Sequence, residues 1–213
     1  MSEQQARQAA VEELNRQLAE QVRTIDRLRA ELAEEDVRDP LTRLHNRRHL
    51  DRVLAGDLGP AARDDRPAVV VRDIDHFKAV NDRFGHAAGD TVLTAVARLL
   101  QASVRGGDTA VRLGGEEFLL VLPGADRAQG IRRAEELRRG VAAVMHAFGG
   151  PRVRVTVSAG VAANRPGDGR SVAALLEAAD RALYTAKAAG RDRVVAAGAA
   201  RPAAAEAEVV PAG

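Results

Sequence analysis

The residues best suited to chemistry lie in the run 112–118, which reads Arg-Leu-Gly-Gly-Glu-Glu-Phe. Apolar, strand-like segments flank this run, and a Gly-Gly pair between two strands predicts a tight hairpin turn, because its central residues need positive φ. Without side chains at Gly114 and Gly115, another molecule can approach the backbone closely. Glu116 and Glu117 follow directly, so the hairpin presents two carboxylates beside this opening. Such a turn is suited to metal-bound phosphate, although a solvated loop remains the plainer interpretation.

Two further segments carry groups of matching chemistry. Asp73 and Asp75 follow an apolar, β-branched run, which predicts carboxylates at the end of a strand. Lys187 and Arg191 come at the end of the last predicted helix, and Lys187 is one of only two lysines, the other being Lys78. Carboxylates at neighbouring strand ends form an oxygen site for Mg²⁺, which binds through one or two carboxylates plus substrate phosphates. The cations would hold the phosphates, as would backbone N–H groups at the helix start after Asp75.

Each of these features also has a plain structural interpretation. Asp73 and Asp75 are typical helix-capping acids, and Lys187 with Arg191 is typical of solvated charge at a helix C-terminus. Taken together, however, the three segments favour a site for a nucleoside triphosphate.

Composition narrows the class of protein. The 213 residues, 46% of them hydrophobic, suit one domain with an appendage. A formal charge of +2 and an aromatic content of 2% argue against a nucleic-acid surface. The absence of cysteine excludes disulfides and thiolate metal sites and suits a reducing compartment, so we expect a cytoplasmic protein. No apolar run of about 18 residues occurs, so neither a membrane span nor a signal peptide is predicted.

The N-terminal segment has a heptad pattern. Apolar residues alternate at spacings of three and four, with one polar member, at Val11, Leu14, Leu18, Gln21, Ile25, Leu28 and Leu32. This narrow stripe predicts a parallel two-stranded coiled coil, with Gln21 setting the register. A single amphipathic helix lying on the domain is the alternative. We predict a coiled-coil helix over 1–36, a catalytic domain over 37–196 and a disordered tail over 197–213.

The remaining elements follow from periodicity and capping signals. Asp39-Pro40 predicts the start of a helix containing Leu41, Leu44 and Leu50. Strands are expected at 68–72, on both sides of the glycine pair, at 153–159 and at 193–196; helices are expected at 77–84, 89–102, 127–145 and 172–189.

Four motifs in this order resemble the GGDEF domain of diguanylate cyclases. They are DxLTxLxNRR at 39–48, DIDHFKAVNDRFGHAAGD at 73–90, RLGGEEF at 112–118, and ADxALYxAKxxGR at 179–191. The signature has the GGEEF form, and the resemblance extends from Asp39 to about Val195. It implies an α+β fold, the palm-like nucleotidyl cyclase fold, with a mostly antiparallel central sheet flanked by helices.

The resemblance also implies roles for individual residues. Asp73 and Glu117 would ligate Mg²⁺, or Mn²⁺ in its place, helped by the carbonyl of Ile74. Glu116 would act as general base for a 3′-hydroxyl or as a further metal ligand. Asn81 and Asp90 would bind guanine. The phosphates would be bound by the amides near His76 and Phe77 and by the side chains of Lys78, Lys187 and Arg191. Gly114 and Gly115 would leave room for the nucleotide.

A domain of this kind holds one GTP, so joining two nucleotides requires two half-sites that face each other. The resemblance therefore implies a homodimer that makes cyclic di-GMP, and the coiled coil would bring the two domains together. It also implies an inhibitory product site of the RxxD form at Arg105 and Asp108, with Arg132 from the following helix. Glu136 stands where some members have another arginine, which would weaken inhibition. For Arg105 to Asp108, a polar turn is the plainer interpretation.

Three other functions compete with this one. A degenerate domain that only senses GTP or cyclic di-GMP is opposed by the intact Glu116, Glu117, Asp73 and Lys187. A cyclase with altered base choice is opposed by Asp90, because adenine-tolerant relatives of the family replace this acid. A pure coiled-coil scaffold would not need four phosphate-site motifs.

Overall fold

The computed structural model describes residues 15–28, 36–55, 67–148, 152–164 and 168–198. The chain divides into two units, the boundary lying between Arg38 and Asp39. In the first unit residues 15–28 are helical, which agrees with the heptad pattern over this range. Its apolar side chains are exposed, with Leu18 at 57%, Ile25 at 47% and Leu28 at 48%. The other predicted apolar seam positions, Val11, Leu14 and Leu32, lie outside the described residues.

A five-stranded sheet in the order β2-β3-β1-β6-β7 forms the centre of the second unit. Its strands are β1 (Ala68–Ile74), β2 (Thr109–Gly114), β3 (Glu117–Leu122), β6 (Val157–Ala163) and β7 (Val194–Ala196). All neighbours pair antiparallel except β6 and β7, so the predicted mostly antiparallel sheet is confirmed. Two short strands, β4 (Met145–Ala147) and β5 (Arg152–Arg154), form a separate pair.

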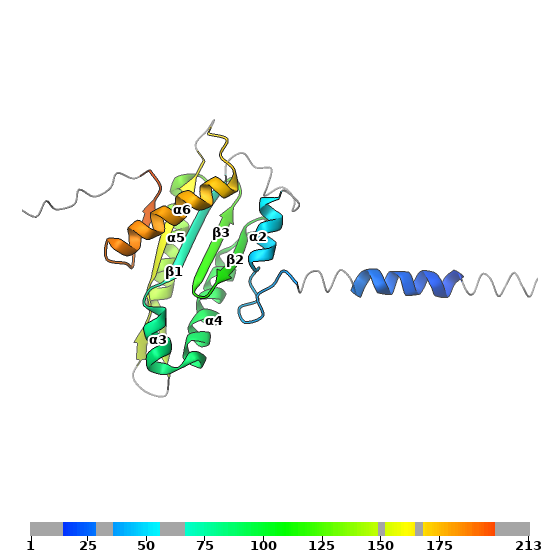
Figure 1. The fold of residues 1–213 in the computed structure, drawn as a ribbon, viewed down its shortest axis with the longest axis horizontal. Helices are drawn as coiled ribbons and strands as arrows, with labels where there is room; N and C mark the ends of the chain where they lie inside the picture. The colour runs from blue at the N-terminus through cyan, green and yellow to red at the C-terminus, as the bar shows by residue number, and fades with distance from the viewer. Residues whose placement is uncertain (1–14, 29–35, 56–66, 149–151, 165–167, 199–213) are drawn as a thin grey trace, which may run out of the picture. The chain divides into compact units, whose positions relative to one another are not determined.

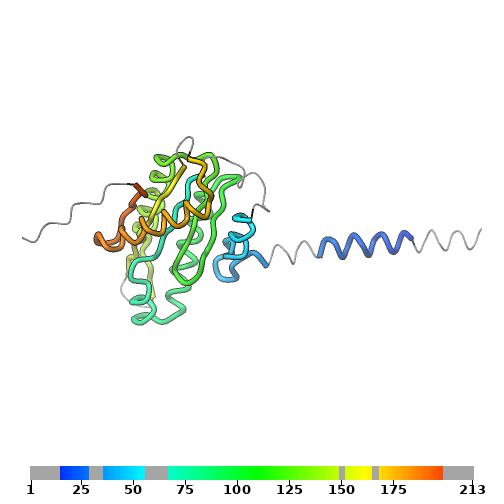
Figure 2. Tube along the Cα trace, turned by 45° about the horizontal axis from the view of Figure 1, so that its top comes forward, coloured from blue at the N-terminus to red at the C-terminus, as the bar shows by residue number. Residues whose placement is uncertain are grey.

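Helices cover both faces of this sheet. The main core lies under α4 (His86–Ser103) and α5 (Arg127–Ala143), with α3 (Phe77–Phe84) packing at its edge; α6 (Val172–Ala188) and α2 (Arg47–Leu54) pack on the opposite face. Figures 1 and 2 show α6 and α5 on opposite sides of the central strands. No helix among the described residues is long and apolar enough to span a bilayer.

The buried central strand β1 separates the two cores, because successive side chains of a strand point to opposite faces. Val70 and Ile74 belong to the core under α4 and α5, whereas Val69 and Val71 belong to the core under α6. Asp73 therefore shares the α6 face of the sheet.

The helix predicted to open at Asp39-Pro40 is wrong. Asp39 lies in a turn, where its carboxylate accepts hydrogen bonds from the amide and hydroxyl of Thr42 at 2.8 and 2.7 Å. A carboxylate used in this way competes with helix formation. The helix begins instead at Arg47, where the side chain of Asn46 accepts from the His49 amide at 3.2 Å.

The predicted strand 153–159 is divided between two sheets. Residues up to Arg154 pair with β4, and β6 begins at Val157. At the break, the hydroxyl of Thr156 donates to Asp75 at 2.7 Å, and its carbonyl accepts from the Asp75 amide at 2.9 Å. The hydrogen bonds to Asp75, which is distant in the sequence, therefore separate β5 from β6. The alternation of valines in 153–159 carries no sign of this break.

The ends of the other four predicted helices agree with the structure to within three residues. The helix predicted at 77–84 is confirmed, and α4 begins at His86 rather than at Gly89. The strand predicted at 193–196 is confirmed from Val194 onward. The predicted tail beyond residue 198 lies outside the described residues.

Candidate active site

The turn between β2 and β3 is displaced by one residue from its predicted position. Gly114 pairs with Glu117, so the two residues between the strands are Gly115 and Glu116. Both glycines nevertheless have positive φ, at 149° and 51°. The register is also irregular between Arg112 and Gly114, and a bulge of this kind redirects the end of a strand.

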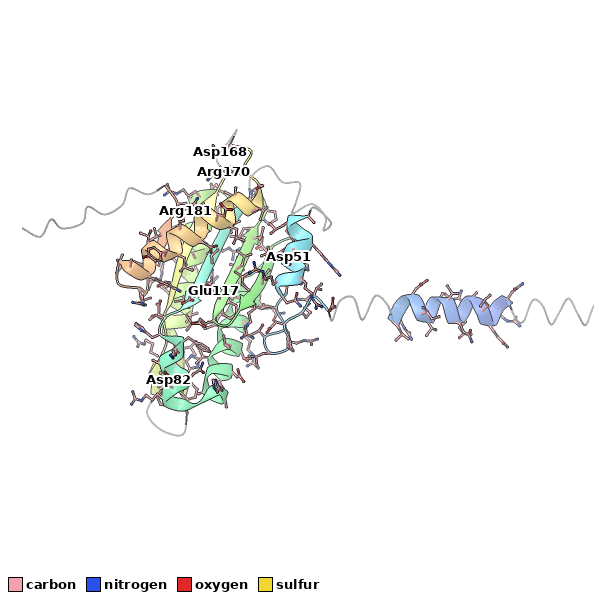
Figure 3. All side chains as sticks on the ribbon, in the orientation of Figure 1. Asp51, Asp82, Glu117, Asp168, Arg170 and Arg181 are labelled. Carbon is pink, nitrogen blue, oxygen red and sulfur yellow. The ribbon has the colours of Figure 1, made fainter. Side chains whose placement is uncertain are left out.

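Asp73 and Glu117 lie directly opposite each other on the antiparallel strands β1 and β3. Asp73 is buried, with 7% of its surface exposed. The Ile74 amide donates to the carbonyl of Glu116 at 3.3 Å, which ties the turn to β1. Because opposite residues on neighbouring strands lie within side-chain contact, two carboxylates of the second and third motifs meet at one point. Figure 3 labels Glu117 over the sheet.

Lys187 joins this pair from the end of α6. Its Nζ lies 2.8 Å from Oδ2 of Asp73. The contact depends on close packing of α6 against β6, since a Cβ at Gly160 would overlap the backbone of Ala179 and Leu183. One turn beyond Leu183, the helix therefore brings Lys187 within reach of β1.

The electrostatics of this cluster favour a cation. Burial raises the pKa of Asp73, against the opposing effect of Lys187, and the charges of Glu116 and Asp75 raise it further. Burial also raises the pKa of Glu117, as do the charges of Asp73, Asp180 and Glu116, while Lys187 again opposes the shift. Holding both carboxylates ionised is therefore costly, and a bound divalent cation would offset that cost.

These residues fit a magnesium ion completed by substrate. Among the described residues, no group of three or more His, Cys, Asp or Glu side chains is arranged to hold a metal. Two carboxylates and a backbone carbonyl suit Mg²⁺, which commonly takes one or two carboxylates and fills its remaining positions with phosphate and water.

Asp75 organises the surroundings of the site, a role that the sequence did not indicate. Its carboxylate accepts from the hydroxyls of Thr156 and Ser158, both at 2.7 Å, and from the Asp192 amide at 3.1 Å. It therefore fastens the start of β6 and the turn after α6 to the end of β1. The position of Asp75 two residues after Asp73, just beyond the end of β1, is the signal that could have suggested this.

The turn after α6 carries Arg191 in a strained conformation. Arg191 and Asp192 have φ of 60° and 43°, a region that residues other than glycine occupy at a cost. Besides its bond to Asp75, Asp192 forms an ion pair of 2.7 Å with Arg138 of α5. These two contacts hold the turn, so Arg191 is presented from a fixed backbone.

The start of α3 and the first turns of α4 carry residues predicted to contact guanine and phosphate. His76 has φ of 57°, and no side chain caps the helix there, so the amides of Phe77 and Lys78 lack intrahelical acceptors. A Cβ at Gly89 would overlap Oδ1 of Asn81, so Asn81 lies against α4 at Gly89, the residue before Asp90. That buried Oδ1 accepts no hydrogen bond from any described residue.

The three residues of the predicted inhibitory site lie together, apart from the carboxylate cluster. Arg105, Asp108 and Arg132 line a cavity of about 410 Å³, which Arg133 and Glu136 also line. The amide of Arg105 donates to Asp108 at 2.9 Å, so the loop is also the polar turn that its composition suggested.

A family model described as "Diguanylate cyclase, GGDEF domain" matches residues 36–193. This chain belongs to the GGDEF diguanylate cyclase family. Curated relatives include diguanylate cyclase DgcP of Pseudomonas aeruginosa, 43% identical over 160 residues that make up 73% of this chain and 23% of DgcP. The response regulator PleD of Caulobacter vibrioides is 40% identical over 168 residues, 75% of this chain and 36% of PleD. The chain thus spans about a quarter to a third of the length of these relatives.

Solved GGDEF structures are similar to this one. The coiled coil and GGDEF domain of DgcB from Caulobacter crescentus, in complex with c-di-GMP, has a TM-score of 0.72 and 33% identity, covering 86% of this chain and 99% of that one. The active GGEEF domain of a diguanylate cyclase from Vibrio cholerae has a TM-score of 0.63 and 31% identity, covering 72% of this chain and 97% of that one.

The GGDEF domain also has a smaller cavity that the sequence did not predict. It has a volume of about 290 Å³, lies between α2, α6 and the hairpin, and includes Glu117, Lys187, Arg47, Asp180 and Tyr184 in its lining. Burial raises the pKa of Asp180, against the charges of Arg181 and Arg47. Asp180 and Arg47 both belong to motifs of the family, which was the available signal.

Proposed function

We propose that this chain is a diguanylate cyclase that joins two GTP molecules into cyclic di-GMP and releases two pyrophosphates. The observation that carries the proposal is the pairing of Asp73 with Glu117 across β1 and β3, with Lys187 2.8 Å from Asp73. Such a cluster has the charges needed to hold a metal-bound triphosphate. Membership of the family supports the same reaction.

Asp73, Glu117 and the carbonyl of Ile74 are the proposed ligands of Mg²⁺, with Mn²⁺ as an alternative. When bound, the ion neutralises charge that develops on the phosphates. Glu116 accepts the proton of the attacking 3′-hydroxyl, or serves as a further ligand. Each 3′-oxygen then forms a bond to the α-phosphorus of the other GTP, the bond between the α-phosphorus and the bridging oxygen breaks, and pyrophosphate leaves.

Substrate recognition is divided between the two ends of GTP. Asn81 and Asp90 are proposed to bind guanine, because an acceptor pair suits its N1–H and exocyclic amine. The unpartnered Oδ1 of Asn81 supports this role. The phosphate contacts are proposed to come from the amides at His76 and Phe77 and from Lys78, Lys187 and Arg191, while Gly114 and Gly115 leave room for the nucleotide.

The reaction requires two chains, because each half-site supplies one GTP. The helical segment with exposed Leu18 and Ile25 supports a homodimer formed through a coiled coil. In such a dimer the coil raises the effective concentration of one catalytic domain around the other.

The test is incubation of the purified chain with GTP and Mg²⁺, followed by mass spectrometry of the products, with Glu116→Ala as control. Cyclic di-GMP and pyrophosphate from the wild type, and neither from the variant, is the expected result. Bound GTP without product, even after forced dimerisation, would contradict catalysis and favour the sensing function. An adenine-containing dinucleotide would contradict the proposed base choice.

We also propose that cyclic di-GMP binds at Arg105, Asp108 and Arg132 and inhibits the enzyme. Glu136 lines the same cavity, and its charge opposes a phosphate there. We therefore expect weak inhibition in the wild type and stronger inhibition in Glu136→Arg, by about tenfold in inhibition constant for one added charged contact. Equal inhibition of Glu136→Arg, Arg132→Ala and the wild type, measured from initial rates, would contradict this site.

A further inference from the structure

Arg112 joins two segments that are 73 residues apart in the sequence. On one side Nη1 donates to both carboxylate oxygens of Asp39, at 3.0 and 3.2 Å. On the other side Nε and Nη2 donate to the carbonyl of Gly115, at 3.1 and 2.8 Å. The guanidinium is largely shielded, with 13% of the side chain exposed. One planar group thus holds the carboxylate and the turn carbonyl at once.

The carbonyl of Gly115 belongs to the same planar peptide unit as the N–H of Glu116. Fixing the direction of this carbonyl therefore fixes the plane from which Glu116 and Glu117 emerge. Glycine itself has little conformational preference, and Gly115 has φ of 51°. A contact from outside the turn is needed to select one orientation of the peptide unit.

We propose that Arg112 is a positioning residue, which holds the Gly115 carbonyl so that Glu116 and Glu117 face Asp73, and that Asp39 anchors Arg112 in this role. The catalytic consequence rests on the proposed function, whereas the ordering of the turn does not. The Ile74 amide bonds to the Glu116 carbonyl at 3.3 Å, so the turn is held on the other side by β1.

Asp39 is itself fixed, which makes it a suitable anchor. Its carboxylate accepts from the amide and hydroxyl of Thr42, and its own amide donates to the Leu44 carbonyl at 2.8 Å. Burial raises the pKa of Asp39, but the hydrogen bonds from Thr42 and Arg112 outweigh this and leave the pKa below its ordinary value. The anchor is therefore ionised at neutral pH. Since Asp39 is the first residue of the second unit, the start of the catalytic domain and its turn share one guanidinium.

The test is Arg112→Lys, which keeps the charge but replaces the planar fork with a single ammonium that cannot span both partners. Arg170→Lys is a matched control, because Arg170 also bridges a carbonyl, that of Ala163 at 2.8 Å, and a carboxylate, that of Asp168 at 3.1 Å. Figure 3 shows Asp168 and Arg170 at the end of the domain away from Glu117.

We expect Arg112→Lys to lower kcat by about tenfold or more, since small misplacements of catalytic groups have effects of this size. Most of the proposed contacts to GTP lie outside the turn, so the dissociation constant for GTP should change by a smaller factor than kcat. Arg170→Lys should match the wild type in both. Asp39→Asn should lower kcat in the same direction, and the double variant should be no worse than Arg112→Lys alone. Wild-type kcat in Arg112→Lys would overturn the proposal.

Amide hydrogen exchange separates this proposal from the proposed function. Exchange in residues 113–117 should be about tenfold faster in Arg112→Lys than in the wild type and unchanged in Arg170→Lys, because the turn opens more readily once its anchoring contact is lost. A wild type that makes no cyclic di-GMP even after forced dimerisation would refute the proposed function, and exchange would still test the turn. Unchanged exchange in Arg112→Lys would refute the positioning role.

Discussion

Neighbouring residues of β1 carry opposite charges into the interior on opposite faces of the sheet. Asp73 faces α6, where Lys187 and Glu117 meet it. Arg72 lies on the other face with only 1% of its surface exposed, and no described residue accepts a hydrogen bond from its guanidinium. The charge of Asp73 thus belongs to the proposed active site, whereas the charge of Arg72 has no role in the proposed chemistry.

Asp73→Asn should lower activity by at least about a hundredfold. The same substitution should stabilise the metal-free protein. Burial raises the pKa of Asp73, so between the ordinary value and the raised one the folded state binds more protons than the unfolded state. Stability therefore falls as pH rises through this window, and the ionised carboxylate is a cost at neutral pH. Thermal unfolding without metal should give a higher Tm for the variant at pH 7. The difference in Tm should become smaller as the pH is lowered toward the ordinary pKa of Asp. A lower Tm at pH 7 would contradict this.

Arg72→Met should raise the free energy of unfolding by about 2 kcal/mol or more, because a buried charge without a partner gives way to an apolar chain of similar length. Burial lowers the pKa of Arg72 to about 9, so its cost is fully present at neutral pH and decreases only as pH rises above that value. Urea unfolding at pH 7 measures the change. Arg98→Met, on the exposed side of α4, is the control and should change stability little. A destabilised Arg72→Met would mean that the guanidinium has a favourable role in the core.

At the scale of elements, two glycines make room for groups of the site: one for the backbone of a helix and the other for a side chain. Gly160 lets the backbone of α6 lie on β6, which brings Lys187 to Asp73. Gly89 at the start of α4 leaves space for the side chain of Asn81. Both glycines lie within regular elements, where glycine is otherwise unfavourable, so close packing explains their presence.

Gly89→Ala should raise the KM for GTP by about tenfold, the value of roughly one hydrogen bond to the base. The new methyl group would displace Oδ1 of Asn81, which is the end of a flexible side chain. It would also lie 3.0 Å from the ring of Phe77, so a thermal melt checks that the fold survives. Gly140→Ala in α5 is the matched control, because its Cβ would meet nothing nearer than Leu99 at 4.0 Å. Initial rates over a range of GTP concentrations measure both. An unchanged KM in Gly89→Ala would argue against a base contact from Asn81.

At the scale of the whole molecule, the proposed reaction depends on the encounter of two catalytic domains. The exposed stripe on helix 15–28 has the composition of a dimer seam, and Val22 is also 48% exposed beside it. The predicted seam from Val11 to Leu32 has only about three heptads, which make a weak dimer on their own, so activity should depend on protein concentration.

Leu18→Gln with Ile25→Gln should lower activity per molecule by at least about tenfold at dilute protein, because the effective concentration from the coil is lost. Ala19→Gln with Asp26→Gln, which leaves the seam positions intact, is the control. Cyclic di-GMP formation and sedimentation, measured over the same dilution series, test the link. Activity per molecule that is unchanged in the seam variant would exclude a role for the coil, whereas recovery by fusion to an unrelated dimer would support it.

Local signals in the sequence determined much of this protein. The helix at 77–84, the buried strand before Asp73 and the positive φ of both glycines follow from periodicity and from steric preference, which act over a few residues. The four motifs likewise identified the family, because motif order and spacing are properties of the chain itself.

Contacts between distant residues were decided only by the tertiary structure. Asp39 accepts hydrogen bonds from Thr42 and Arg112 instead of capping a helix. Thr156, between β5 and β6, donates a hydrogen bond to Asp75. Neither outcome is encoded in local pattern, because each partner is equally able to form a local cap or strand. The same holds for Lys187, whose approach to Asp73 requires α6 to pack on Gly160. Sequence thus specified which groups are present, while packing at long range decided which of them meet, because side-chain contacts depend on how whole elements are stacked.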